Sequence, residues 1–311
     1  MERNSLWSRM KGWFVGTPST RVAPRDVETV EFPRADGPGH LRGLRVGVAS
    51  TVGTVREHNE DNFYLPSDLR DPVRGGDGDH KAGREYAVIP DTIYAFVVAD
   101  GMGGQLAGEK ASQMAVDLVP RELARRFGPG ETNDEAIQRA IRDSVAAANQ
   151  EILGLSHIQT EFSNMGTTIV LALFRNDRAY IAGIGDSRAY RIRDGQFEQL
   201  TKDHSLADAL VGAGTITKEE LPNHKFKHIL YLYLGSKDAR GGPEEVRAAE
   251  VRPGDRFLLA SDGLTGVVSD ELLTRIVEGG DDPLDTATRL VAKAIENQSK
   301  DNVTCLVIHA S

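Results

Sequence analysis

The sequence predicts an α+β fold built mainly from antiparallel sheets. Asn176-Asp177 and Asp194-Gly195 each separate two strand-like runs, and such short polar turns are typical of hairpins. Long helical patterns are grouped between the strand runs and do not alternate with them one by one, which favours α+β over a doubly wound parallel sheet. We find no internal repeat.

The predicted strands are short apolar runs closed by glycine or turn residues. A first strand is expected at residues 44–50. Residues 65–91 are polar and rich in Gly and Asp, which predicts an exposed connection. Further strands are expected at residues 94–99, 167–174, 179–185, 188–193, 256–261 and 303–309.

Apolar residues at helical spacing predict two long helices, at residues 108–127 and 133–153. Asn133 is placed to cap the second of them. Residues 204–243 have helical and irregular character, and we expect Asp203 to cap the helix that follows it. Two more helices are expected at residues 269–278 and 283–297, before the last strand.

Residues 1–43 differ from the rest of the 311-residue chain and form a predicted N-terminal extension ahead of a globular domain at residues 44–311. The extension contains both tryptophans, Trp7 and Trp13. Leu6, Met10 and Trp13 recur at helical spacing, with basic residues nearby. Two interpretations stay open: a partly disordered or packed peptide, and a docking helix for a partner or an anionic membrane surface.

Composition excludes several classes of protein. The net charge is −9, and no dense Lys/Arg tract is present, which argues against nucleic-acid binding. The single cysteine, Cys305, lies in an apolar run, so a disulfide framework or thiolate metal site is not expected. No apolar stretch approaches the length of a membrane span and no signal peptide is visible, so we expect a cytoplasmic protein.

Three apolar runs end abruptly on an aspartate, namely Asp100, Asp186 and Asp262. Asp61 and Asp301 also lie beside predicted strand ends. An acid at the point where a buried strand surfaces is costly unless its charge is compensated. Carboxylates gathered at strand ends suit hard divalent cations, which prefer oxygen ligands. The pattern therefore predicts a metal site.

The motifs around these aspartates resemble, in order, those of the metal-dependent protein phosphatases of type 2C. The blocks are Arg56 with Asn59-Glu60-Asp61, Asp100 to Gly104 followed by Gly108-Glu109, Gly166 to Thr168, Gly185 to Arg188, Asp203 to Ser205, Ser261 to Leu264, and Asp301-Asn302. The run Asp-Gly-Met-Gly-Gly is usual in the bacterial branch. The resemblance covers residues 44 to 309, nearly the whole chain beyond the extension.

The resemblance implies a four-layer α-β-β-α sandwich, in which two antiparallel sheets pack face to face and helices flank both. It also implies a centre of two manganese or magnesium ions. By motif, Asp100 would bridge the two ions with help from the Gly101 carbonyl, and Asp262 and Asp301 would hold one ion.

The remaining motif positions would complete the site. Glu60 and Asp61 would support the other ion, partly through water, and Asp186 with Asp262 would match a third, weaker metal site. Arg56 would bind the substrate phosphate, since an arginine can hold two phosphate oxygens at once. Replacing Arg56 is therefore expected to weaken phosphate binding and leave metal binding intact.

The sequence departs from the family pattern in three places. Met102 stands where many eukaryotic members have a histidine proposed as general acid, so the proton donor to the leaving group is unassigned. Gln105 occupies a position that is often histidine in bacterial members. Residues 224–235 differ most, which puts substrate choice and the third-metal environment in doubt.

The expected function is metal-dependent hydrolysis of phosphoserine and phosphothreonine in proteins, opposing a Ser/Thr kinase in a signalling circuit. One rival is a catalytically weak regulatory module of the same fold that binds phosphoproteins. The intact Asp61, Asp100, Asp262 and Asp301 argue against it. A second rival is a two-metal phosphodiesterase or nuclease, against which the acidic composition counts.

Overall fold

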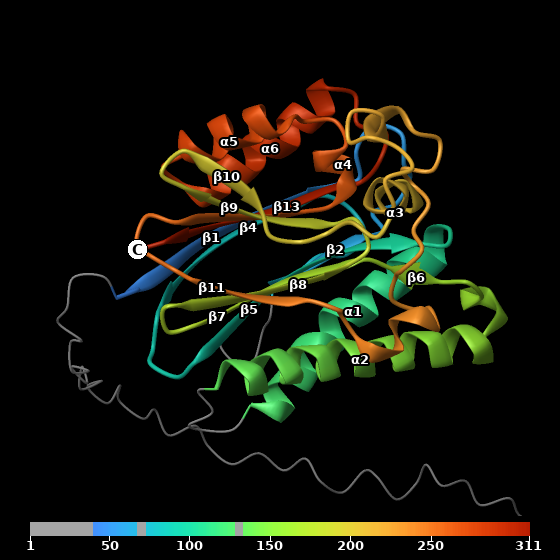
Figure 1. The fold of residues 1–311 in the computed structure, drawn as a ribbon, viewed down its shortest axis with the longest axis horizontal. Coiled ribbons are helices and arrows are strands. Elements are labelled where there is room, and N and C mark those ends of the chain that lie inside the picture. Colours follow the sequence, from blue (N-terminus) through green and yellow to red (C-terminus); the bar gives the residue numbers. More distant parts are fainter. Residues whose placement is uncertain (1–39, 67–72, 128–132) are drawn as a thin grey trace, which may run out of the picture. The chain divides into compact units, whose positions relative to one another are not determined.

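A computed structural model describes residues 40–66, 73–127 and 133–311 of the chain. Within these residues, antiparallel strands form two sheets that pack face to face, and helices cover the outer face of each sheet (Figure 1). The four-layer α-β-β-α sandwich that the family resemblance implied is confirmed. The segment around Trp7 and Trp13 lies outside the described residues, so the extension and its docking role stay predictions.

The first sheet runs in the order β10-β9-β12-β13-β1-β4, with every pair antiparallel. Its strands are β1 (Gly43–Thr51), β4 (His80–Ala87), β9 (Arg188–Arg193), β10 (Gln196–Gln199), β12 (Arg256–Ala260) and β13 (Val303–Ala310). Among the described residues, the first strand, β1, therefore pairs with the last strand, β13.

The second sheet runs in the order β11-β8-β7-β5-β2-β3, and its pairs are also antiparallel. Its strands are β2 (Asp61–Leu65), β3 (Val73–Arg74), β5 (Ile93–Met102), β7 (Ile169–Arg175), β8 (Arg178–Ile184) and β11 (Val246–Glu250). The short β6 (Gly166–Thr167) pairs with the end of β5.

Apolar side chains from both sheets fill the space between them. Phe174 lies at the centre of this layer, with its ring 5.8 Å from that of Phe96 and 5.1 Å from that of Phe257, both edge to face. All three rings are fully buried. Edge-to-face contact is the geometry that aromatic quadrupoles favour, so these rings fix the two sheets against each other.

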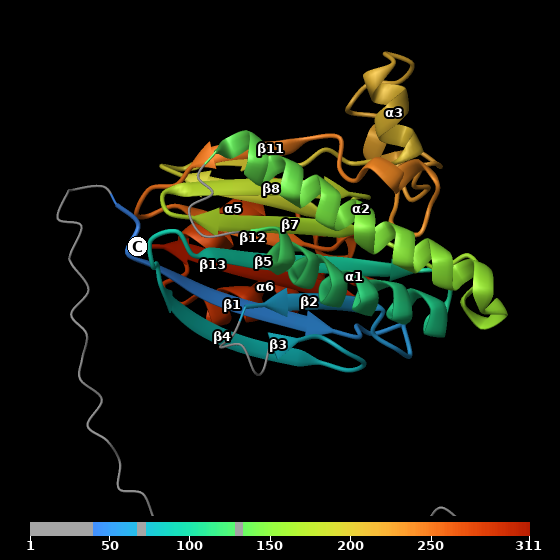
Figure 2. The same cartoon turned by 90° about the horizontal axis from the view of Figure 1, so that it is seen from below.

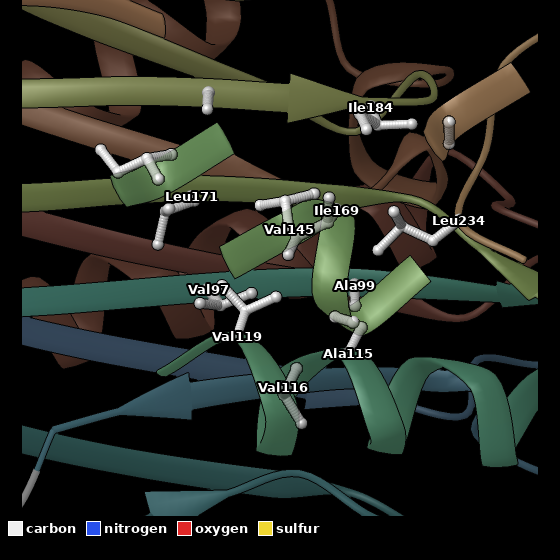
Figure 3. Packing of buried hydrophobic residues seen from close by; sticks show 14 of the residues in the cluster. Val97, Ala99, Ala115, Val116, Val119, Val145, Ile169, Leu171, Ile184 and Leu234 are labelled. Carbon is white, nitrogen blue, oxygen red and sulfur yellow. The ribbon is translucent and has the colours of Figure 1, made fainter. Parts of the chain in front are cut away.

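Helices close both outer faces of the sandwich. The second sheet is covered by α1 (Gln105–Arg126) and α2 (Asp134–Ile158), which lie against each other across its strands (Figure 2). Val119 and Val145 of these helices pack on Val97 and Leu171 of the sheet (Figure 3). The first sheet is covered by α4 (Asp262–Thr265), α5 (Asp270–Glu278) and α6 (Pro283–Glu296).

The two predicted hairpins are confirmed. Arg175 pairs with Arg178 across the first turn and Arg193 with Gln196 across the second. Asn133 also caps α2 as predicted, because its side chain accepts a hydrogen bond from the Glu135 N–H. Both predicted long helices exist, but α1 begins three residues before the predicted start and α2 continues to Ile158.

The predicted connection at residues 65–91 is wrong in part. It contains β3 and β4, both at sheet edges, and β4 is made of mixed, half-exposed residues. An edge strand with one solvated side does not show a clean apolar pattern, and charges there guard against unwanted pairing. The same reason explains why β10 and β11, also edge strands, escaped prediction; β2 was missed inside a polar motif.

The expected cap of α3 (Leu206–Gly212) is also wrong. Ser205, not Asp203, is the N-cap, and its hydroxyl accepts a hydrogen bond from the Asp208 N–H. Asp203 is instead engaged by the Arg188 guanidinium, whose Nη2 lies 2.7 Å from its carboxylate. The Asp203 side chain is only 6% exposed, and a carboxylate so buried needs a charged partner, which Arg188 provides.

Candidate metal centre

The antiparallel pairing brings the predicted acids to one end of the sandwich. Asp61, the first residue of β2, is the register partner of Asp100 near the end of β5. In the other sheet, Asp262 follows β12 and Asp301 precedes β13, and these strands are antiparallel neighbours. Residues distant in sequence therefore meet because one strand ends where its neighbour begins.

A pocket of about 650 Å³ opens at this end. Every predicted site residue except Asp61 lines it, namely Arg56, Glu60, Asp100, Gly101, Asp186, Asp262 and Asp301. Asp61 lies behind the wall, with 1% of its surface exposed. The structure thus brings the predicted set together in one place.

Asp61 is an incompletely satisfied buried acid. Its Oδ2 accepts a hydrogen bond from the Ser261 hydroxyl at 2.8 Å, whereas its Oδ1 has no partner among the described residues. Burial, and to a smaller extent the neighbouring Asp262 and Asp301, raise the pKa of Asp61 to about 7 against the opposing hydrogen bond from Ser261. A native structure rarely leaves such an atom unpaired without a purpose.

Asp100 stands at the centre of the negative charge. Burial raises the pKa of the Asp100 carboxyl well above its usual range, and Asp61, Asp262, Asp186 and Asp301 all act in the same direction. Its backbone is held on both sides by Thr168, whose hydroxyl accepts from the Asp100 N–H at 3.0 Å and whose N–H donates to the Asp100 carbonyl at 2.8 Å. The main chain is fixed, whereas the surroundings of the side chain disfavour its ionised form.

Glu60 and two glycines are packed against each other without room for a further carbon atom. A Cβ on Gly108 would lie 1.8 Å from Glu60 Oε2, and one on Gly101 would lie 2.2 Å from the Gly108 carbonyl oxygen. Burial raises the pKa of Glu60, while Arg56 lowers it. Only glycine at these two positions lets α1 approach the pocket wall this closely.

Asp186 follows β8 after Gly185, whose φ of 99° needs glycine. Burial and then Asp262 raise the pKa of Asp186 to about 7. The Gly185 N–H donates to Nδ1 of the buried His204 at 3.1 Å, so this histidine holds the turn before Asp186. The Ser187 hydroxyl bonds Thr168 at 2.7 Å, so it holds the strand ends and is no pocket nucleophile.

Arg56 lines the pocket as predicted but is joined to a predicted metal ligand. Its Nη2 donates to Asp301 Oδ2 at 2.9 Å, while Asp301 Oδ1 accepts from the Asn302 N–H at 2.9 Å. The bond to Asp301 is the main reason that the pKa of Arg56 is raised. The predicted phosphate-binding residue and a predicted metal ligand are therefore in direct contact.

Sequence reasoning gave no role to Asn302, which organises the site. Its side-chain Oδ1 accepts from the Glu60 N–H, and its Nδ2 donates to the carbonyls of Val52 and His58, all at 2.9 Å. It thereby fixes the loop carrying Arg56 and Glu60 to the start of β13. Its place next to Asp301 in a recurring motif was the only signal in the sequence.

His228 is a second residue that the sequence did not single out. It lines the pocket from the segment 224–235, and its Nδ1 lies 3.8 Å from Asp262 Oδ2. The contact raises the pKa of His228. Met102 lines the same pocket, whereas the side chain of Gln105 lies outside what the structure describes.

The acids fit a hard cation that keeps part of its water. Among the described residues, no three His, Cys, Asp or Glu side chains lie close enough to enclose a metal ion unaided. The carboxylates and the Gly101 carbonyl, together with water, would supply the kind of oxygen ligands that manganese and magnesium accept. The unpaired Asp61 Oδ1 and the raised pKa values of Asp61, Asp100 and Asp186 indicate that the protein alone does not compensate these carboxylates when they are ionised.

A sequence profile described as protein phosphatase 2C matches residues 82–299 of the chain. The chain belongs to this family. The match covers the strands and helices from β5 to α6, which carry Asp100, Asp186 and Asp262. The family resemblance drawn from the motifs is therefore confirmed.

Relatives within the protein phosphatase 2C family agree with this assignment. The serine/threonine phosphatase stp of Listeria monocytogenes is 33% identical over 258 residues, which are 82% of this chain and 92% of that protein. The structure of the serine/threonine phosphatase PstP/Ppp of Mycobacterium tuberculosis is 32% identical, with a TM-score of 0.68 over 86% of this chain and 98% of that chain. The predicted enzyme class, a protein-serine/threonine phosphatase, is confirmed at this level.

A further structure, of the PstP catalytic domain, is in complex with two manganese ions. It is 32% identical to this chain and has a TM-score of 0.63, with 86% of this chain and 98% of that chain covered. The predicted manganese or magnesium cofactor agrees with this relative.

None of the helices in the described part of this protein phosphatase 2C chain has the length and apolar character needed to span a membrane.

Proposed function

We propose that the pocket hydrolyses phosphoserine and phosphothreonine in proteins at a centre of two manganese or magnesium ions. Asp100, Asp262, Asp301, Glu60, Asp61 and the Gly101 carbonyl would hold these ions, and Asp186 would hold a third, weaker one. The supporting observation is the collection of acids at one end of the sandwich, with an unpaired carboxylate oxygen in their midst.

Such a site must supply a large rate enhancement, because phosphate monoesters hydrolyse extremely slowly in water. Bound divalent cations would supply an acidified water as nucleophile and screen the phosphoryl oxygens. The pocket contains no cysteine, since Cys305 is fully buried in β13 and burial raises the pKa of its thiol. No covalent nucleophile on the chain is therefore required.

Arg56 would bind the phosphate that enters the pocket. A guanidinium can offer two parallel N–H groups to two phosphate oxygens, which orients the ester as well as attracting it. The bond to Asp301 and the Asn302 side chain hold Arg56 and its loop beside the acids before a substrate arrives. Such positioning lowers the entropic cost of the reaction.

The leaving oxygen must gain a proton. Met102, at the position of the family's proposed general acid, has none to give. We infer that water in the open pocket protonates the leaving serine or threonine oxygen. This assignment predicts a rate that depends on the pKa of the leaving group, which a series of aryl phosphates can measure.

The proposal is tested by manganese-dependent hydrolysis of p-nitrophenyl phosphate and of a phosphothreonine peptide. Asp262→Asn should lower kcat by roughly 10²- to 10³-fold, since metal ions contribute several kcal/mol and each 1.36 kcal/mol is tenfold. Asp143→Asn, on the exposed face of α2, is the matched control and should keep full activity.

The two rivals give different results in the same assay. A phosphoprotein-binding module would bind the peptide but show no turnover with any divalent metal. A nuclease or phosphodiesterase would cleave DNA, RNA or a phosphodiester and prefer it to the monoester. Equal activity of Asp262→Asn and the native protein would remove Asp262 from the centre.

We further infer that the cellular substrates include the phosphorylated targets of a Ser/Thr kinase, or that kinase itself. Supporting this, the relatives are named serine/threonine phosphatases. A phosphoproteome of cells lacking the protein should show increased phosphoserine and phosphothreonine. An increase confined to phosphotyrosine would contradict the inference.

A further inference from the structure

Basic side chains line the pocket beside the acids. They are Arg56, Lys227 and Lys300. Arg56 is engaged with Asp301 and has the role described above. Lys227 and Lys300 come from segments far apart in sequence, one from residues 224–235 and one from the turn before β13. Neither lysine belongs to the residues assigned above to the metal ions or to the substrate phosphate.

The segment that carries Lys227 is fixed at the pocket by backbone hydrogen bonds. The Leu206 N–H donates to the Ile229 carbonyl at 2.8 Å, and the Tyr231 N–H donates to the His204 carbonyl at 2.9 Å. Further along, Thr167 and Leu234 exchange two backbone bonds. The same segment contributes Lys227 and His228 to the pocket lining, and His228 lies 3.8 Å from Asp262.

The turn that carries Lys300 is equally well anchored. The Ser299 hydroxyl donates to the Gly263 carbonyl at 2.8 Å, and its N–H donates to the Ala294 carbonyl at 2.9 Å. Ser299 is buried, whereas Lys300, the next residue, is exposed. The lysine therefore stands at the solvent side of the pocket, next to Asp301.

The charges in the pocket divide into two groups. Every acidic residue that lines it, namely Glu60, Asp100, Asp186, Asp262 and Asp301, belongs to the predicted metal set. Cations bound there would compensate this group, and a substrate would then meet the basic side chains of Arg56, Lys227 and Lys300. This is a local basic feature on a chain whose net charge is −9.

The pocket is also larger than one phosphate needs. Its volume of about 650 Å³ lies in the range of sites that hold a molecule of tens of atoms. Successive residues of an extended peptide are about 3.3–3.6 Å apart, so neighbours of the phosphorylated residue reach the edge of such a pocket.

We propose that Lys227 and Lys300 recognise a second anionic group close to the phosphorylated residue, so that the enzyme favours acidic or doubly phosphorylated peptide segments. The inference rests on the proposed function and assigns a substrate class to the same site. A carboxylate and a second phosphate share the chemistry that a lysine ammonium binds. Which one is preferred is decided by experiment.

The experiment compares three phosphothreonine peptides: one with neutral neighbours, one with Asp at the two positions on each side, and one with a second phosphothreonine two residues away. For each enzyme, the ratio of kcat/KM between an anionic peptide and the neutral peptide is measured with manganese at low salt. Using a ratio within one enzyme cancels any general loss of activity.

The native protein should favour at least one anionic peptide by about 3- to 10-fold, as expected for two partly exposed charge pairs. The double variant Lys227→Gln, Lys300→Gln should lower this ratio to about one. The matched control, Lys218→Gln with Lys237→Gln, makes the same change of charge at exposed lysines that do not line the pocket and should keep the native ratio. Circular dichroism confirms that each variant is folded.

The outcomes separate the two proposals. Turnover of all three peptides at equal kcat/KM by the native protein, or an unchanged ratio in the double variant, would overturn the role of the lysines while leaving the phosphatase proposal in place. No turnover of any peptide or of p-nitrophenyl phosphate with any metal would overturn the proposed function and this inference with it. Preference for the Asp peptide identifies a carboxylate, and preference for the second phosphate identifies a phosphate.

Discussion

The middle of the sandwich and its acidic end are built from the same strands but follow opposite physical rules. In the middle, Phe96, Phe174 and Phe257 pack edge to face with no exposed surface. A few residues further along β5, Asp100 faces Asp61 across the pair, and carboxylates replace apolar side chains. One region is fully satisfied by the protein, while the other holds charge that the protein leaves unbalanced.

The comparison indicates where stability and function lie. Burial of large apolar side chains supplies most of the free energy of folding. The acidic end reduces this stability, because buried unpaired carboxylates oppose folding until cations neutralise them. Substitutions in the middle should therefore lower the free energy of unfolding. Substitutions of the acids should lower activity and raise the free energy of unfolding of the metal-free protein.

The largest expected effect on stability is in the middle. Phe174→Ala should destabilise the protein by about 3–5 kcal/mol, because a fully buried ring is lost and leaves a cavity between the sheets. Urea unfolding measures this. Ile158→Ala, at the exposed end of α2, should change stability by less than about 0.5 kcal/mol. A loss of similar size at both positions would contradict the assignment of the core.

An intermediate effect of opposite sign is expected at the acidic end. Without metal at pH 8, Asp61→Asn should stabilise the protein by about 1–3 kcal/mol, since it removes a buried charge whose Oδ1 has no partner among the described residues. The same change should abolish most of the metal-dependent activity. Destabilisation at pH 8 would show that the Ser261 bond outweighs the cost of burying the charge.

The contribution of Asp61 to the free energy of unfolding depends on pH, and its sign follows from the raised pKa. The pKa of Asp61 is raised to about 7, so the folded state keeps a proton between pH 4 and 7 that the unfolded state has lost. Stability from this group is full below pH 4 and falls as the pH rises through 7. His309, whose pKa burial lowers to about 4, gives the opposite slope, but it is present in both proteins. The difference between the native and Asp61→Asn profiles therefore cancels His309 and reports Asp61 together with its effect on the pKa of Asp100.

How much the sequence could predict differs between the same two regions. The central strands and the aspartates that end them were predictable, because buried strands are apolar and an acid at their end is conspicuous. Edge strands such as β4 were not, since half of their surface is solvated. Asn302 and His228 were missed because their contacts cross the chain: Asn302 bonds Glu60, which is 242 residues away. No local pattern encodes such a contact.

The smallest predicted effect concerns Arg56. From the sequence we expected metal binding to be independent of this residue, and the structure leads us to predict a small dependence instead. The 2.9 Å ion pair with Asp301 places a positive charge beside a predicted metal ligand. Arg56→Ala should therefore tighten manganese binding by about 2- to 5-fold, the size of one exposed charge pair, while raising KM for phosphate esters. Calorimetric titration measures this affinity, with Arg56→Lys as the control that keeps the charge. Weaker manganese binding to Arg56→Ala would contradict the predicted competition.

The central claim, that the acidic end of the sandwich holds the catalytic cations, is tested most directly by locating them. Crystals of the native protein grown with manganese chloride can be measured by anomalous diffraction at the manganese edge. We expect two strong peaks in the pocket, both within ligand distance of Asp100, and their loss in crystals of Asp262→Asn and Asp100→Asn grown in the same way. Strong peaks only outside this pocket, in a protein that shows manganese-dependent phosphatase activity, would contradict it.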